Sequence, residues 1–407
     1  MSRLHILSIA SSRLLAPDDP IAGAFEWDQV RALARAGFKV GVLAPKPRNL
    51  RTLKSGRVES ATSKHAARID GVPVFRFPGF VWIPERVPYL FGKAFERIGK
   101  DLYRQYVTEY GAPDVLHAHN ALYAGSLAAA LKRPEGIPSV LTEHSSAYLR
   151  EGRHRAWQGG IARRAVYAAD AHVGVSPALC RALTLEYPMR EGRWEWIPNV
   201  LSPIFEDQDD EIPAPGGEET FRFLAVGSLK QVKDHRRLIS AFAQAFGGDA
   251  GVSLRIGGEG PLRSELEEQI QRLGVSEQVR LLGGLSRERV LSEMRSCDAF
   301  VLSSSTETFG VVLIEALSCG RPVVATACGG PEEIVDEADG LLVHAPGVES
   351  LADGLRSLKS TIRAYDAKGI RERCLRRFGG AAVAERLRAV YERVLDDPGA
   401  SGGTRRG

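Results

Sequence analysis

The chain has 407 residues and a net charge of +4, with 44% hydrophobic and 26% charged residues. This composition is that of an ordinary globular protein with two or three domains. It excludes a membrane-spanning helix, because no apolar run approaches the roughly 20 residues required and the longest candidate, 121–131, is too short.

The charge is unevenly distributed along the chain. Residues 1–200 carry 28 Lys and Arg against 18 Asp and Glu, whereas residues 201–407 carry 26 against 32. A basic half joined to an acidic half favours an anionic partner for the basic half, such as a lipid surface or a phosphorylated acceptor. A solvated surface without a partner is the alternative.

The cysteines and the first residues indicate in which cellular compartment the protein resides. The five cysteines show neither paired nor metal-ligand spacing, which is typical of reduced thiols in cytoplasm. Residues 4–12 are too short for a signal peptide and lack a cleavage site, so we expect a first strand there. We predict a cytoplasmic protein that the segment 75–106 could hold peripherally at the inner face of a membrane.

The first half of the chain alternates apolar runs of strand length with helical patterns. This alternation predicts parallel βαβ units and a doubly wound sheet. The expected strands are 4–11, 38–45, 113–119, 137–144 and 170–176, and the expected helices are 24–37, 121–133 and 156–169.

Residues 206–220 break this pattern with acidic residues, Pro and Gly, which predicts a linker. A second α/β series follows it. Its strands are expected at 221–228, 251–260, 278–284, 298–304 and 322–330, and its helices at 234–246, 261–274, 286–296 and 309–320. We therefore expect two open α/β domains, a last helix at 380–396 and a disordered tail at 397–407.

Glu315 is the most informative residue, because the helix expected around it is apolar on every side. A buried carboxylate is costly unless strong donors or a ligand's hydroxyl groups satisfy it. The first N–H groups of this helix, from Phe309 to Val312, would point at an anion. A phosphorylated ribose fits both features.

Two glycine-containing turns favour a phosphate or nucleotide site. Lys230 and Lys233 follow Gly227 in a turn between a strand and a helix, where backbone amides and a lysine can bind phosphate. Gly258 and Gly260 would allow close approach of the backbone to a ligand. Surface lysines and an ordinary turn are the alternatives.

Glu307 and Glu315 could also be the paired carboxylates of a glycoside hydrolase. Eight helical residues span about 12 Å, whereas such pairs lie about 5 Å or at most about 9.5 Å apart. We therefore expect the two residues to grip different parts of one elongated ligand.

Three histidines lie at strand ends. We expect His117 and His119 to point to opposite faces of the sheet, so that only one of them faces a cleft. A His-x-His pair without a third ligand is poor evidence for a metal site. His119 is the stronger candidate for an active-site role, and His144 is the weaker one.

Segment 75–106 combines an apolar helical stripe with cations that lie off it. The stripe favours an interfacial helix that docks on anionic lipid or reaches a lipid-linked acceptor, but a core-facing helix has the same pattern. We do not expect nucleic-acid binding, because no recognisable module is present. The stripe comprises Phe91, Phe95, Ile98, Leu102 and Tyr106, and the cations are Lys93, Arg97, Lys100 and Arg104.

The second half of the chain resembles the retaining family-4 glycosyltransferases (glycosyl transferases group 1) in six motifs that occur in order. They are VGSLKQVKDHRRLI, RIGGEGPLRSELE, VRLLGGLSRERV, ETFGVVLIE, ALSCGRPVVAT and GGPEEIV. The resemblance covers nearly the whole chain. It implies the GT-B fold, α/β with two Rossmann-like domains facing a cleft. An acceptor-binding domain would span 1–203 and be completed by 380–396, and a donor-binding domain would span 204–379.

The resemblance also implies roles for matching residues. Glu315 would bind the ribose of a nucleotide-sugar, and Glu307 would face the sugar. Lys233 would neutralise the departing diphosphate, and His119 would approach the transferred sugar. The other donor-binding positions would be the amides of Phe309, Gly310 and Val311, together with Gly227, Ser228, Lys230, Gly258 and Gly260. Two positions depart from the pattern, since Ser228 replaces a frequent Arg and Thr308 replaces a frequent Gly.

The implied reaction moves a sugar, with retention, from a UDP- or GDP-sugar to a glycan or lipid-linked acceptor, in the biosynthesis of cell-surface polysaccharide or glycolipid. No metal and no cofactor is expected. A nucleotide-sugar 2-epimerase of the same fold is the alternative, and a catalytically inactive sugar-binding protein is a third class.

Overall fold

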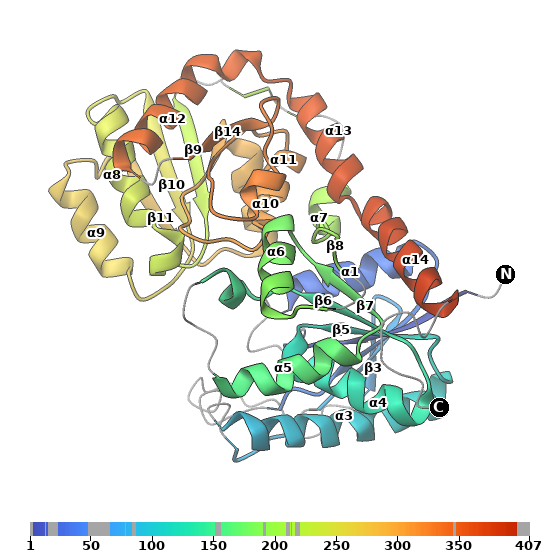
Figure 1. Ribbon diagram of the computed structural model, residues 1–407. Coiled ribbons are helices and arrows are strands. Elements are labelled where there is room, and N and C mark those ends of the chain that lie inside the picture. The colour runs from blue at the N-terminus through green and yellow to red at the C-terminus, as the bar shows by residue number, and fades with distance from the viewer. Residues whose placement is uncertain are drawn as a thin grey trace. The chain divides into compact units, whose positions relative to one another are not determined.

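The computed structural model describes residues 3–12, 14, 23–47, 66–77, 79–83, 87–150, 156–189, 193–208, 212, 214–215, 220–344 and 347–396. The chain divides into two compact units, Met1–Val200 with Gly380–Gly407, and Leu201–Gly379 (Figure 1). The division lies three residues before the predicted one. Most of the predicted linker and the whole predicted tail lie outside the described residues.

The first unit is built on an eight-stranded sheet of order β3-β4-β2-β1-β5-β6-β7-β8. The predicted parallel pairing is confirmed among the five expected strands, β1, β2, β5, β6 and β7. Of the strands that were not predicted, β4 and β8 also pair in parallel with β2 and β7, whereas β3 and β4 are antiparallel. The strands are β1 (His5–Ile9), β2 (Lys39–Ala44), β3 (Ala66–Ile69), β4 (Val72–Arg76), β5 (Val115–His119), β6 (Ser139–Glu143), β7 (Ala171–Gly174) and β8 (Trp194–Trp196).

The β3–β4 hairpin was not among the predicted elements. Asp70 and Gly71 form its two-residue turn and both have positive φ, 49° and 80°. Asp-Gly is favoured in such turns because both central residues must adopt left-handed conformations. The dipeptide was thus a readable signal for this hairpin.

Helices cover both faces of this sheet. α3 (Pro88–Tyr110), α4 (Ser126–Glu135) and α5 (Ala156–Ala168) lie together along one side, and α1 (Ala24–Arg35) lies on the other with α14 (Gly380–Asp396) (Figure 1). α6 (Pro177–Glu186) packs on β7 and β8. Val383, Leu387 and Tyr391 of α14 are buried in the same core as α1, so the end of the chain completes the first unit.

The helix predicted at 121–133 begins later than expected. Residues Ala121–Gly125 form an irregular turn, η1, and α4 follows it. Asn120 and Tyr123 have φ of 68° and 66°, which a regular helix excludes. Gly125 N–H donates to the Asn120 carbonyl at 3.0 Å and closes the turn.

The apolar stripe of α3 is a core stripe, so the core-facing alternative is correct for it. Phe91, Phe95 and Tyr106 are fully buried, and Leu102 is 2% exposed. The Tyr106 ring packs on the bare backbone of Gly41, and its hydroxyl lies 2.6 Å from His5 Nε2. No helix among the described residues is long and apolar enough to cross a membrane.

The second unit is built on a parallel six-stranded sheet of order β11-β10-β9-β12-β13-β14. Its strands are β9 (Phe221–Val226), β10 (Val252–Gly257), β11 (Val279–Gly283), β12 (Ala299–Leu302), β13 (Val323–Thr326) and β14 (Gly340–Val343). One face forms a core with α8 (His235–Phe246), α9 (Arg263–Arg272) and α12 (Val348–Thr361). The remaining helices, outside this core, are α7 (Pro203–Glu206), α10 (Arg287–Ser296), α11 (Val311–Ser318) and α13 (Ala367–Phe378).

Candidate active site

The carboxyl edge of the second sheet gathers most of the predicted donor residues. Gly227 follows β9, Gly258 follows β10, and the segment 303–310 leads from β12 to α11. Since β10, β9 and β12 are neighbours in a parallel sheet, their carboxyl ends lie side by side. Ligands of open α/β sheets bind at this edge.

α11 confirms the predicted buried helix. It begins at Val311 after Gly310, whose φ of 101° favours glycine, and six of its residues are buried. Glu315 is 7% exposed, and Arg287 Nη2 lies 3.5 Å from its Oε1. The cation that faces this carboxylate therefore comes from the first residue of α10, which no sequence pattern singled out.

Lys233 and Glu307 contact each other directly. Lys233 Nζ donates to Glu307 Oε1, and Ser304 Oγ donates to the same oxygen at 2.8 Å. The two loops are also joined through their backbones, because Ser305 N–H donates to the Val232 carbonyl at 2.9 Å and Ser303 Oγ donates to the Lys233 carbonyl at 2.9 Å. The chain thus holds a cation and a carboxylate together beside the start of α11.

The two glycine turns pack backbone against backbone. Gly227 N–H donates to the Gly257 carbonyl, and Leu229 N–H donates to the Glu259 carbonyl, both at 2.9 Å. A Cβ at Gly258 would lie 1.9 Å from the Gly227 carbonyl oxygen, and one at Gly260 would lie 2.4 Å from that of Leu229. Loop packing alone therefore requires both glycines.

The remaining predicted positions divide by exposure. Lys230 is exposed and Ser228 is half-buried. The Phe309 side chain is 1% exposed and its ring centroid lies 5.8 Å from that of Phe378, so only its backbone can face a ligand. Gly330 packs against the backbone of Phe309, where a Cβ would approach to 2.3 Å.

His235 was missed in the sequence. It is the first residue of α8 and 5% exposed, and burial lowers its pKa to about 4 against the opposing effect of the Gly227 and Ser228 backbone. It is therefore a neutral ring behind the first glycine turn. Its proximity to Lys233 in sequence was the available signal.

His117 and His119 do not point to opposite faces, so that expectation was wrong. Their rings are stacked with centroids 4.9 Å apart, because side chains two residues apart in a strand share a face. His117 is tied to the core, where its Nδ1 lies 2.6 Å from the Tyr391 hydroxyl and its Nε2 lies 2.7 Å from Thr142 Oγ1.

His119 and His144 form a hydrogen-bonded pair. His119 Nδ1 lies 3.1 Å from His144 Nε2, and His119 Nε2 has no hydrogen-bond partner among the described residues. Burial lowers the pKa of His119 to about 4 and that of His144 well below its usual value. Both rings are therefore neutral near pH 7, and one must donate to the other.

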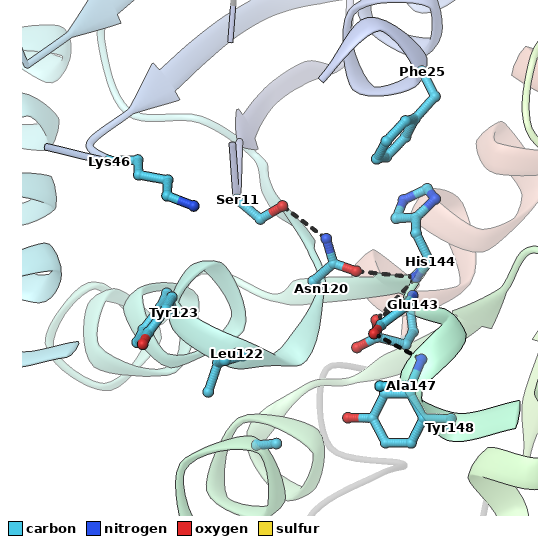
Figure 2. A pocket seen from close by; sticks show the side chains of 12 residues that line it. Ser11, Phe25, Lys46, Asn120, Leu122, Tyr123, Glu143, His144, Ala147 and Tyr148 are labelled. Carbon is cyan, nitrogen blue, oxygen red and sulfur yellow. Dashed lines mark hydrogen bonds between the residues drawn. The ribbon is translucent and has the colours of Figure 1, made fainter. Parts of the chain in front are cut away.

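A pocket of about 480 Å³ opens beside His144 in the first unit. Figure 2 shows that Asn120 links its two sides, since its Nδ2 donates to Ser11 Oγ at 2.7 Å and its Oδ1 accepts from the His144 amide at 3.1 Å. Glu143 Oε1 also accepts from the His144 amide, at 3.0 Å. The lining residues are Ser11, Phe25, Lys46, Asn120, Leu122, Tyr123, Glu143, His144, Ser145, Ala147, Tyr148 and Ala162.

Glu143 and Asn120 hold this pocket in shape. Glu143 is 1% exposed, accepts three backbone N–H groups, and has a pKa raised by burial. Asn120 has a strained φ of 68°, and the two hydrogen bonds of its side chain to Ser11 and His144 offset this strain. Of the lining residues only His144 was a sequence candidate, because the others come from separate strand ends, turns and helices, including Phe25 of α1 and Ala162 of α5.

His119 and His144 belong to the first unit, and the other predicted site residues belong to the second. The predicted approach of His119 to the transferred sugar therefore stays a prediction. Among the described residues, no three His, Cys, Asp or Glu side chains come together as a metal site would require.

Comparison with known proteins identifies both halves of the chain. Residues 26–203 match the model of Glycosyltransferase Family 4, and residues 207–366 match that of Glycosyl transferases group 1. The chain is 30% identical over 315 residues to alpha-maltose-1-phosphate synthase of Mycolicibacterium smegmatis, which covers 70% of this chain and 80% of that protein.

Solved structures are similar to it in fold. Sucrose-phosphate synthase from Thermosynechococcus elongatus gives a TM-score of 0.73 at 20% identity, over 97% of this chain and 100% of that one. Anabaena HepE in complex with UDP and glucose gives 0.69 at 20% identity, over 96% and 100%. The named relatives are transferases, which does not favour the epimerase alternative. The chain belongs to the family-4 glycosyltransferases of GT-B fold and is a transferase enzyme.

Proposed function

We propose that the protein moves a sugar, with retention of anomeric configuration, from a nucleotide diphosphate sugar to a glycan or lipid-linked acceptor, in cell-surface polysaccharide or glycolipid biosynthesis. The observation that carries the proposal is the pairing of Lys233 with Glu307 beside the start of α11, with Glu315 further along the same helix. One short region thus offers charges suited to a diphosphate, a sugar and a ribose.

Glu315 would accept hydrogen bonds from the ribose hydroxyls. Its carboxylate is almost buried, and hydrogen bonds to a charged acceptor are stronger than neutral ones. Arg287, 3.5 Å away, would hold the carboxylate in place. HepE, which shares the fold, was solved with UDP and glucose, and this supports a UDP-sugar as the first donor to test.

Lys233 would exchange Glu307 for the diphosphate when donor binds. Its charge and the first amides of α11 would then stabilise the negative charge that develops on the leaving group. Glu307, released from the lysine, would accept hydrogen bonds from the sugar hydroxyls. Because Lys233 and the first amides of α11 would neutralise the leaving group, the proposal calls for no metal cofactor.

The pocket beside His144 would receive the acceptor. Ser11, Asn120 and Ser145 offer polar groups to hydroxyls, and the rings of Phe25 and Tyr148 offer apolar faces to a sugar ring (Figure 2). Its volume of about 480 Å³ lies in the range of small-molecule sites. His119, behind this pocket, would act as a neutral hydrogen-bonding group toward the transferred sugar.

The donor is identified first by thermal denaturation with UDP, GDP and ADP and their sugars. A ligand at 100 times its dissociation constant stabilises the protein by about 2.7 kcal/mol. The best nucleotide-sugar is then incubated with glycan and lipid-linked acceptors, and the product is examined by NMR. We expect the transferred sugar to have the same anomeric configuration as in the donor.

Two results would contradict the proposal. An altered sugar that is still attached to nucleotide after incubation without acceptor would indicate an isomerase. Inversion at the anomeric carbon would leave a transferase but exclude retention.

A further inference from the structure

The three helices on one side of the first sheet carry an excess of positive charge. α3, α4 and α5 together hold eight Lys and Arg against four Asp and Glu. Because the apolar stripe of α3 is buried in the core, its cations face away from the sheet, and Lys93, Arg97 and Arg104 are exposed. Arg163 and Arg164 are exposed on α5. This surface is the three-helix face.

A pocket of about 250 Å³ lies within the three-helix face. Lys100 of α3, Arg133 of α4 and Arg164 of α5 line it, so each helix contributes one cation. None of the three makes a hydrogen bond or ion pair to any described residue. The pocket therefore presents three uncompensated charges.

The only carboxylate in the pocket lining is already engaged. Glu96 Oε1 accepts from Ser126 Oγ at 2.5 Å, and its Oε2 lies 3.5 Å from Lys93 Nζ. It therefore leaves the three cations free to bind an anion. A phosphate group carries the charge and acceptor oxygens that lysine and arginine bind best.

Exposed apolar side chains are concentrated in the sequence around the start of α3. Trp82, Tyr89 and Leu90 are 78%, 63% and 51% exposed, and Val87 lies between them at 40%. Seven large hydrophobic side chains are exposed among the described residues, and these four fall within nine positions. Trp and Tyr prefer the boundary between water and the lipid acyl chains. Lys93 Nζ lies 5.9 Å from the centre of the Tyr89 ring, so aromatic and basic groups are continuous here.

We propose that the three-helix face docks on an anionic phospholipid surface. The pocket formed by Lys100, Arg133 and Arg164 takes the phosphate of a headgroup, while Trp82, Tyr89 and Leu90 insert among the headgroups. Charge complementarity selects a lipid surface over an apolar protein partner, because the apolar cluster is bordered by cations. The inference rests on the proposed function where it places the enzyme beside a lipid-linked acceptor, but lipid binding itself does not require turnover.

The test uses sedimentation of the full chain with vesicles of phosphatidylcholine, alone or with phosphatidylglycerol. We expect binding to the anionic vesicles only, and its loss as salt is raised. The triple variant Lys100→Gln, Arg133→Gln, Arg164→Gln should weaken binding about a hundredfold, since each cation near an anionic surface contributes about fivefold. The control is a triple variant that removes three exposed cations of the second unit, Arg272→Gln, Arg280→Gln, Arg363→Gln. It should change vesicle binding by less than about threefold.

The apolar cluster is tested separately. Trp82→Ser with Leu90→Ser should lower vesicle binding and abolish the blue shift of tryptophan fluorescence, whereas Leu185→Ser, at an 84% exposed site on α6, should change neither. Equal sedimentation with neutral and anionic vesicles would overturn the proposal. So would anionic binding that the pocket variant weakens no more than its control does. Stabilisation by inorganic phosphate without vesicle binding would also overturn it.

Donor-induced thermal shifts of the same variants separate the two proposals. The three-helix face belongs to the first unit, so donor stabilisation should persist in all of them. Loss of vesicle binding with donor binding intact tests only the docking surface. Failure of every nucleotide-sugar to bind tests only the proposed function.

Discussion

Glu315 combines an unfavourable position with a specific partner. It lies in a helix whose other side chains are apolar or small, yet Arg287 approaches its carboxylate to 3.5 Å and 7% of the residue stays exposed. That exposed edge is where a ligand's hydroxyls can bind. Lys233 and Glu307 also pair with each other, and in the proposed function donor binding separates them.

Glu315→Gln should weaken donor binding about 10- to 150-fold, because hydrogen bonds to a charged group contribute about 1.5–3 kcal/mol. The amide is isosteric, so the melting temperature without ligand should change little. Titration calorimetry with the donor measures the effect, and Glu268→Gln, at an exposed glutamate of the same unit, is the control. Unchanged affinity in Glu315→Gln would remove the ribose from this residue.

Lys233→Met and Lys230→Met distinguish the two lysines of the first turn. Lys233 is half-buried against Glu307, whereas Lys230 is exposed. Loss of a positioned charge on the leaving group should lower kcat about 100- to 1,000-fold in Lys233→Met, and less than tenfold in Lys230→Met. The reverse order, in steady-state kinetics, would assign the charge to Lys230 in place of the missing Arg at Ser228.

Burial of His119 should make stability depend on pH. Its folded pKa of about 4 lies below the unfolded value of 6.5, so the unfolded state binds more protons and stability falls as pH drops below about 6.5. The loss should reach about 2 kcal/mol at pH 5 and of order 3 kcal/mol near pH 4.

His119→Gln should show a correspondingly weaker decline of the free energy of unfolding between pH 7.5 and pH 5. Urea titrations at the two values measure it, with His344→Gln, at an exposed site, as the control. An unchanged decline in His119→Gln would mean that the ring is not buried and neutral as the structure has it.

At the scale of elements, the strand ends and the turns that follow them set the positions of the candidate site residues. The turns after β9 and β10 are joined by backbone hydrogen bonds, and the loop before α11 is joined to the segment ending at Lys233. These contacts position amides and side chains on rigid strand ends rather than on free loops. The sequence showed which turns contain glycine, but it did not show that the glycines pack on one another.

Gly258→Ala should destabilise the second unit by at least about 2 kcal/mol, since its Cβ would overlap the Gly227 carbonyl oxygen and its φ is +146°. Gly274→Ala is the matched control, because its φ of +69° carries only the left-handed cost of about 1 kcal/mol and nothing lies within 4 Å of the added Cβ. Urea unfolding compares the two. Equal losses would show that the turns do not pack as described.

At the scale of the whole molecule, the chain has two units with separate cores. The proposed donor-binding residues all lie in the unit 201–379, and the pocket beside His144 lies in the other. The three-helix face also belongs to the first unit, which is the basic half of the chain. Part of the excess positive charge of residues 1–200 thus lies on α3, α4 and α5.

Hydrogen exchange should report this division. A bound nucleotide should slow exchange of the amides in 227–233, 257–261 and 303–312, and leave those of 144–149 unchanged. Mass spectrometry of peptides with and without nucleotide measures it, and peptides from α12 serve as an internal reference. Protection confined to the pocket of the first unit would contradict the proposal, because the nucleotide would then bind the first unit and not the second.

The sequence by itself determined the alternating α/β order and the family, and it supplied the candidate donor residues, because strand length, apolar periodicity and ordered motifs are local properties of the chain. It did not determine that Arg287 faces Glu315, that Lys233 pairs with Glu307, or that the stripe of α3 is core. It also led to the wrong faces for His117 and His119. Contacts between residues tens of positions apart depend on how strands order themselves in a sheet and helices pack on it, and only the tertiary structure decides them.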